Sequence, residues 1–174
     1  MTIDEKNIND MTDEAADALA RQCAQAMWAK DKASQNLGME MIDVAAGRAI
    51  FRMKVQPYML NGHNICHGGY IFTLADTCFA FACNSRNNLM VAQHCTITFI
   101  APVLGDMELT ARATEIYRHR RNGLYDIVIT DEKGTKLAVF RGAARQVKGT
   151  HIDLENTQSD DKKEAQKEAQ KEIM

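Results

Sequence analysis

The stretch NGHNICHGGYIFTLADTCFAFAC, residues 61–83, joins a polar loop to a run rich in helix-forming and aromatic side chains. No Gly or Pro interrupts the run after Gly69, and its apolar residues lie nearly all round a helix. Such a helix has to be buried on most sides. The stretch therefore predicts a long helix that the rest of the chain covers, with the loop at its N-terminal end.

Alternating runs on both sides of this helix predict the strands that cover it. Before the helix, two runs within residues 39–55 flank Ala46-Gly47, which indicates a hairpin. After it, turn residues separate four further runs, at Gly105-Asp106, Asn122-Gly123 and Lys133-Gly134. We therefore expect an α+β fold in which an antiparallel sheet of about six strands wraps the helix.

The two ends of the chain differ from this core. Helical spacing of apolar residues predicts one amphipathic helix from Met11 to about Lys32, with Asp10 and Thr12 as candidate caps. The last residues, KKEAQKEAQKEIM, indicate a solvated helix or a frayed end. We divide the chain into a helical extension (1–35), a main domain (36–150) and a charged tail (151–174).

Composition narrows the function classes. A length of 174 residues predicts one domain, and a net charge of -2 leaves no strong field to hold DNA or anionic lipid over a wide face. No apolar stretch of about 18 residues is present. The acidic N-terminus lacks the features of a signal peptide, and the 5 cysteines are an odd number. We expect free thiols and a cytoplasmic location.

Asp76 is the one side chain of the predicted helix that carries a charge at neutral pH. A lone buried carboxylate costs several kcal/mol unless it has partners. Perturbed carboxylates in apolar clefts favour function, so Asp76 is a candidate catalytic group. The structural alternative is a partly exposed Asp on a thin polar stripe with Thr73 and Thr77.

His67-Gly68-Gly69 stands where the loop turns into the helix. Glycines allow close approach of the backbone, and the free N–H groups of a first turn point out along the axis at the positive end of the helix dipole. This arrangement suits a carbonyl oxygen that gains negative charge. The alternative is a plain glycine-rich helix start.

The spacing between Gly68 and Asp76 decides whether the helix start and the carboxylate of one chain can act together. Gly68 and Asp76 are eight residues apart, or about 12 Å along one helix. An Asp side chain cannot span that gap to a carbonyl held at Gly68. If both groups serve one site, they come from different subunits, which predicts a dimer with antiparallel helices across a two-fold axis.

The pattern N-G-x-x-x-x-H-G-G-x-x-x-x-x-x-D, together with the strand order, resembles the hotdog-fold acyl-CoA thioesterases of the phenylacetate-degradation (PaaI) type. The resemblance covers about residues 36–147. It implies that Asp76 is the catalytic carboxylate, as general base on water or as nucleophile. It also implies that the Gly68 N–H polarises the thioester carbonyl and that Asn61 orients water or the thioester.

The same resemblance assigns further roles. His67 matches a residue that braces the loop or contacts substrate, and Thr77 matches a hydroxyl beside the catalytic acid that is able to hold water. The implied assembly is a homodimer with shared active sites, or a dimer of dimers and hence a homotetramer. The implied substrates are phenylacetyl-CoA and hydroxyphenylacetyl-CoA, and no metal or cofactor is expected.

Substrate contacts are expected at both ends of an acyl-CoA. Gly69 and Tyr70 lie at the helix entrance. CoA phosphates need cations, and the dense basic cluster contains Arg118, Arg120 and Arg121. A solvated hairpin end is the alternative interpretation of that cluster.

Other site chemistries are less well supported by the sequence. A metal site at His63, Cys66 and His67 has a spacing that fits no common ligand pattern. A cysteine nucleophile at Cys66 or Cys95 is open, although buried cysteines are more often small hydrophobes. The alternative function is a hotdog relative that binds acyl-CoA without turnover, or a dehydratase-like protein. Asp76 beside His67-Gly68-Gly69 favours the thioesterase.

Overall fold

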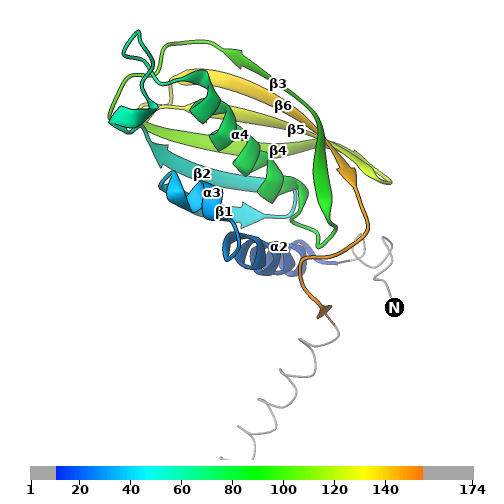
Figure 1. Ribbon diagram of the computed structural model, residues 1–174. Helices are drawn as coiled ribbons and strands as arrows, with labels where there is room; N and C mark the ends of the chain where they lie inside the picture. Colours follow the sequence, from blue (N-terminus) through cyan, green and yellow to red (C-terminus); the bar gives the residue numbers. More distant parts are fainter. Residues whose placement is uncertain (1–10, 155–174) are drawn as a thin grey trace, which may run out of the picture.

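A six-stranded antiparallel sheet curves around one long helix in the computed structural model, which describes residues 11–154 (Figure 1). The strand order is β1-β2-β4-β5-β6-β3. The central helix α4 spans Gly68–Cys83. The strands are β1 (Met39–Ala45), β2 (Arg48–Lys54), β3 (Met90–Phe99), β4 (Glu108–His119), β5 (Asn122–Thr130) and β6 (Lys136–Gln146). The predicted hotdog fold, with its α+β class and strand number, is confirmed.

Helix α4 is buried because the concave face of the sheet supplies apolar partners along its length. Phe79 packs its ring against those of Phe140 and Tyr125. Cys78 is fully buried, and its Sγ donates to the carbonyl oxygen of Ala49 at 3.2 Å. These contacts with the sheet explain why the apolar residues of α4 lie nearly all round the helix.

Within residues 11–154, two helices precede the sheet where the sequence predicts one. Helix α2 (Asp13–Trp28) starts at Thr12, whose side chain accepts from the N–H of Ala15, as expected. The chain then breaks, and Asp31 caps a short second helix, α3 (Lys32–Asn36). The continuous helix predicted to about Lys32 is wrong at its C-terminal end, because the Asp31 carboxylate accepts from the Ser34 N–H and starts a new helix.

Helices α2 and α3 lie against the β1 edge of the sheet (Figure 1). Trp28 packs its ring on Phe51 and Phe81 of the core, and Ser34 is buried. The extension therefore packs onto the main domain. Asp10 and the charged end of the tail lie outside the described residues.

Most of the turns fall where the sequence predicts them. Gly47 (φ 73°) in the β1–β2 hairpin, Gly134 (φ 82°) in the β5–β6 hairpin and Asp106 (φ 63°) in the β3–β4 connection take the left-handed conformation. The turn predicted at Asn122-Gly123 lies instead at Arg120 (φ 51°), since Asn122 already pairs with His119 in the ladder.

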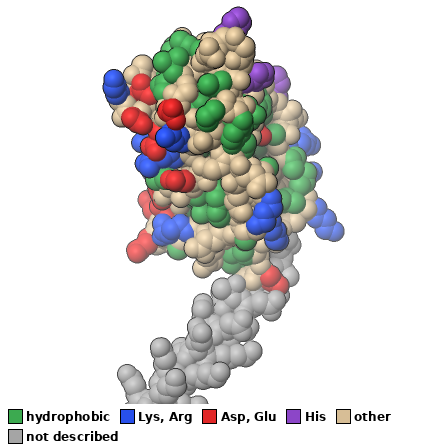
Figure 2. Space-filling model, turned by 60° about the vertical axis from the view of Figure 1, so that its left-hand side comes forward, with side chains coloured by type: hydrophobic (Ala, Val, Ile, Leu, Met, Phe, Trp, Pro, Cys, Tyr) green, Lys and Arg blue, Asp and Glu red, His purple; other side chains and the backbone are tan. Residues whose placement is uncertain are grey.

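No helix in residues 11–154 has the length and apolar character needed to cross a membrane. Basic and acidic side chains lie among one another on the left of the face seen in Figure 2. This mixture agrees with the small net charge of the chain.

Candidate functional site

The loop before α4 is closed by its own hydrogen bonds. A single-turn helix, η1 (Pro57–Met59), leads into it. The Asn61 Oδ1 accepts from the N–H groups of His63 at 2.9 Å and Ile65 at 3.4 Å. Its oxygen therefore holds the loop together. The Nδ2 amide group of Asn61 is left as the donor that this side chain can offer to a ligand.

The first turn of α4 pairs the Gly69 and Tyr70 N–H groups within the protein and leaves the Gly68 N–H without an acceptor in the described part of the chain. His67 is the N-cap, and its Nδ1 accepts from the Gly69 N–H at 3.0 Å, while the His67 carbonyl accepts from Tyr70. No residue in the range 11–154 accepts from the Gly68 N–H. Gly68 thus supplies the free donor at the positive end of the helix.

Gly68 also stands directly beneath an aromatic ring. A Cβ at this position would lie 2.8 Å from Cζ of Phe99, which is closer than carbon atoms approach. Phe99 ends β3, and its side chain is 51% exposed. The glycine therefore allows the end of β3 to cover the start of α4, beside the free N–H.

Asp76 lies half-buried on the same helix, eight residues beyond Gly68. Desolvation by burial raises the pKa of its carboxyl above the ordinary value for Asp. No hydrogen bond joins Asp76 to another residue of the described chain. Since about 12 Å of helix separates Asp76 from Gly68, one protomer does not bring these two groups together.

The side chain of Thr77, the neighbour of Asp76, points toward helix α3. Its side chain is buried, and its Oγ1 lies 3.0 Å from the Oγ of Ser34 on α3. No sequence motif indicates this pair, because its members are 43 residues apart.

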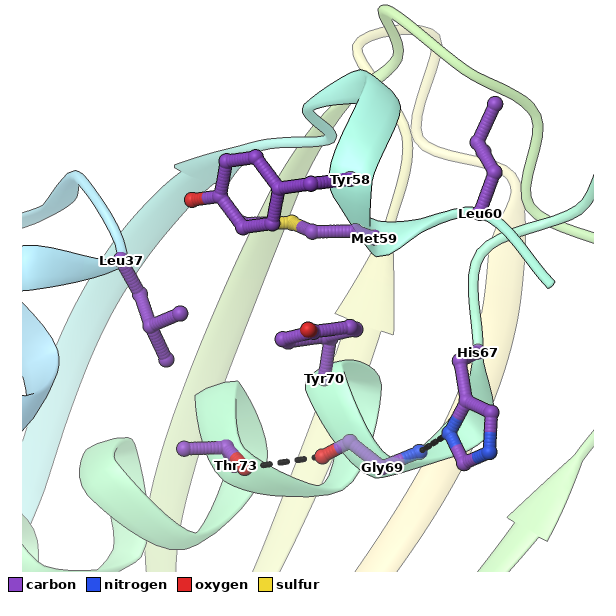
Figure 3. Close-up of a pocket in the computed structure, with 8 residues that line it drawn as sticks. All are labelled: Leu37, Tyr58, Met59, Leu60, His67, Gly69, Tyr70 and Thr73. Carbon is purple, nitrogen blue, oxygen red and sulfur yellow. Dashed lines mark hydrogen bonds between the residues drawn. The ribbon is translucent and has the colours of Figure 1, made fainter.

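A pocket of about 470 Å³ opens beside the first turns of α4 (Figure 3). Of the predicted site residues, His67, Gly69 and Tyr70 line it. The rings of Tyr58 and Tyr70 meet edge to face, with centroids 6.2 Å apart. Sequence reasoning missed the remaining lining residues, which come from the end of α3, from η1 and its flanks, and from α4: Leu37, Tyr58, Met59, Leu60 and Thr73.

The basic cluster lies at the tip of the β4–β5 hairpin, toward the C-terminal end of α4. Burial raises the pKa of the Cys83 thiol to about 12; the Asp76 charge adds to this rise, and the Arg118 charge opposes it. Arg118 and Asp76 therefore both lie near Cys83. Arg120 is exposed, and Arg121 donates to the Gln146 carbonyl at 2.8 Å.

The other site chemistries considered from the sequence are a metal site and a cysteine nucleophile. Within residues 11–154, no three His, Cys, Asp or Glu side chains form a group that could hold a metal ion. Burial raises the pKa of the Cys66 thiol to about 11, and burial together with the Asp76 charge raises that of Cys95. Both shifts disfavour the thiolate that a cysteine nucleophile requires.

The sequence of the chain is similar to those of known thioesterases. The thioesterase superfamily model matches residues 63–138. The chain is 42% identical over 131 residues to the acyl-coenzyme A thioesterase PaaI of Escherichia coli K12, covering 75% of this chain and 94% of the relative.

Solved structures give the same relationship. The E. coli PaaI protein from the phenylacetic acid degradation operon superimposes with a TM-score of 0.76 at 41% identity, over 78% of this chain and 98% of that one. A mutant of the phenylacetic acid degradation protein PaaI from Thermus thermophilus gives a TM-score of 0.65 at 31% identity, over 67% of this chain and 100% of that one.

Proposed function

The chain belongs to the thioesterase superfamily, in the family of the acyl-CoA thioesterase PaaI, and we propose that it hydrolyses acyl-CoA to a free acid and CoA with Asp76 and Gly68 as the central groups. Water supplies a hydroxyl group to the acyl carbon and a proton to the departing thiolate. The observation that carries this assignment is the free Gly68 N–H at the start of the helix that also bears the half-buried Asp76.

The Gly68 N–H donates to the carbonyl oxygen as negative charge develops on it. One well-placed donor of this kind contributes about 3–4 kcal/mol to the transition state. The Nδ2 of Asn61, whose Oδ1 is held by the loop, provides a second donor to the water or the thioester. Asp76 in its ionised form removes a proton from water or attacks the carbonyl carbon itself.

A second copy of this chain completes the site. Within the described residues strand β3 pairs with β6 alone, so its other edge has unpaired backbone groups, and Val91 and Phe99 on it are exposed. Two copies that meet along β3 with antiparallel α4 helices would place Gly68 of each copy near Asp76 of the other. A pair of such dimers would form the homotetramer that the family resemblance implies.

The direct test is thiol release from a panel of acyl-CoAs by the purified protein. Time-dependent release above the rate without protein supports hydrolysis. Binding of acyl-CoA without thiol release would instead support a non-catalytic acyl-CoA-binding protein.

The pocket predicts which acyl group is preferred. A flat arylacetyl group fits against the edges of Tyr58 and Tyr70 in about 470 Å³, whereas a long straight chain needs a deeper channel. We expect kcat/KM for phenylacetyl-CoA to exceed that for palmitoyl-CoA, by about tenfold or more if the longer chain finds no pocket. A higher value for palmitoyl-CoA would contradict this assignment.

The β4–β5 hairpin is proposed to contact the CoA phosphates. We expect Arg120→Gln to raise KM for acyl-CoA by about three- to tenfold, as loss of one charged contact does. The same variant should leave KM unchanged for the acyl-pantetheine thioester, which lacks the nucleotide. Arg112→Gln, an exposed arginine of the middle of β4, is the matched control. Equal effects on both thioesters would reject the phosphate contact.

A further inference from the structure

A chain of buried polar groups connects the N-terminal extension to the helix that bears Asp76. Ser34 of α3 is 2% exposed and Thr77 of α4 is 8% exposed, and their hydroxyl oxygens are 3.0 Å apart. Asp31 takes part from the other side, because its carboxylate accepts from the Ser34 Oγ at 2.6 Å and from the Ser34 N–H at 3.1 Å. Asp31, Ser34 and Thr77 therefore form one connected network.

Counting protons gives the direction of the hydrogen bonds. An ionised carboxylate only accepts, so the single hydroxyl proton of Ser34 goes to Asp31. The Ser34 oxygen can then only accept from Thr77, and the Thr77 proton points toward α3. That proton is not available to Asp76 or to a water molecule beside it.

Helix α3 is held in place independently of this contact. Its Gln35 side chain donates to the Trp28 carbonyl, and the Trp28 ring packs on Phe51 and Phe81. A buried hydrogen bond from a fixed element restrains the partner to which it is directed. Because Thr77 is adjacent to Asp76 on a rigid helix, the bond to Ser34 restrains the rotation of α4 and with it the direction of the Asp76 carboxylate.

We infer that Ser34 is a positioning residue for Asp76, acting through Thr77, and that α3 is a working part of the active site. This inference rests on the proposed function, because it concerns the placement of the hydrolytic carboxylate. It assigns the Thr77 hydroxyl to the joint between α3 and α4 instead of to the hydrolytic water.

A double-mutant cycle in the full-length protein tests the inference. Ser34→Ala and Thr77→Val each remove one side of the hydrogen bond. We expect each to lower kcat by about tenfold with KM nearly unchanged, since small misplacements of a catalytic group have effects of this order. The double variant should be no slower than the slower single variant, because both changes break the same contact. Thr77→Ser keeps the hydroxyl and should be faster than Thr77→Val.

A water-holding Thr77 predicts a different pattern. Ser34→Ala would then keep the wild-type kcat, or its effect would multiply with that of Thr77→Val, and either result overturns the inference. The control is Ser85→Ala at the other end of α4. Ser85 is 1% exposed and its Oγ accepts from the Gly47 N–H and donates to the Ala82 carbonyl.

Melting temperatures separate misplacement from general loss of stability. We expect Ser34→Ala and Ser85→Ala each to lower Tm by about 2–4 °C, while only the former lowers kcat. An equal loss of kcat in both variants would overturn the inference. Failure of the wild-type protein to release thiol from any acyl-CoA would instead reject the proposed function, whereas an active wild type with a fully active Ser34→Ala rejects the positioning role alone.

Discussion

Asp76→Asn is expected to leave the fold intact and to reduce turnover by about 10²-fold or more, the share that a general base supplies. The substitution keeps the size of the side chain and removes its charge and basicity. The measurement is the rate of thiol release at saturating acyl-CoA, with Asp126→Asn as a control carboxylate that is paired with Arg141 on the sheet. Nearly normal hydrolysis by a folded Asp76→Asn protein would remove Asp76 from the mechanism.

We expect the same carboxylate to set the pH dependence of hydrolysis. Burial raises the pKa of Asp76, and the proposed hydrolysis needs its ionised form. Activity should therefore fall as the pH drops through this raised pKa, at a higher pH than an ordinary Asp would give. The acid limb of the wild-type kcat/KM profile measures it, and it should be absent from the residual activity of Asp76→Asn.

Asp76→Asn should lower the activity of the protein without lowering its melting temperature. A folded-state pKa above the unfolded value means that ionising Asp76 opposes folding at neutral pH, and that this cost disappears on acidification. Replacement by a neutral Asn removes the cost. We expect Tm of Asp76→Asn at neutral pH to equal or exceed that of the wild type.

Mixed dimers give the second large effect. We expect Asn61→Ala and Asp76→Ala each to be inactive alone. When they are unfolded, mixed and refolded together, random pairing makes about half of the dimers mixed. In a mixed dimer, one site collects both changes and the other collects neither, so about a quarter of the wild-type activity should return.

This experiment distinguishes two arrangements of the site. If one subunit supplied both Asn61 and Asp76, every site in the mixture would carry a change and no activity would return. Native mass spectrometry confirms that mixed dimers have formed, and each variant refolded alone is the control for recovery. An inactive mixture that contains mixed dimers would reject the shared site.

Local signals in the sequence predict much of the fold. The apolar run of α4, the alternation in β2 and the glycine at Gly47 each act on near neighbours, so their positions follow from the chain itself. The break at Asp31 has only a weak signal, because Asp is a common N-cap residue but helix formers lie on both sides of it. Asn-Gly is a strong turn signal and favours a β4–β5 turn at Asn122. Gly123 is instead required in the strand, where a Cβ would lie 2.7 Å from the Tyr125 ring.

Some residues of the candidate site belong to a local sequence motif, whereas others come together only when the chain folds. His67, Gly68 and Asp76 belong to one motif, and they can be proposed as site residues from it. Tyr58 and Leu37 reach the pocket only through folding of separate segments, and the pairing of Ser34 with Thr77 has no local signature. Non-local contacts of this kind depend on how elements pack, which a single sequence does not encode in any short pattern.

The hydrogen bond between the His67 ring and the Gly69 N–H decides whether the ring offers a ligand a donor or an acceptor. Because Nδ1 accepts from the Gly69 N–H, a neutral imidazole carries its one proton on Nε2, on the far edge of the ring (Figure 3). The ring therefore meets a ligand as a donor. The nearby phenol groups of Tyr58 and Tyr70 can also donate. Molecules that enter with lone pairs, such as carbonyls, carboxylates and ring hydroxyls, find matching donors on the walls, whereas an ammonium group finds no free acceptor on the His67 ring.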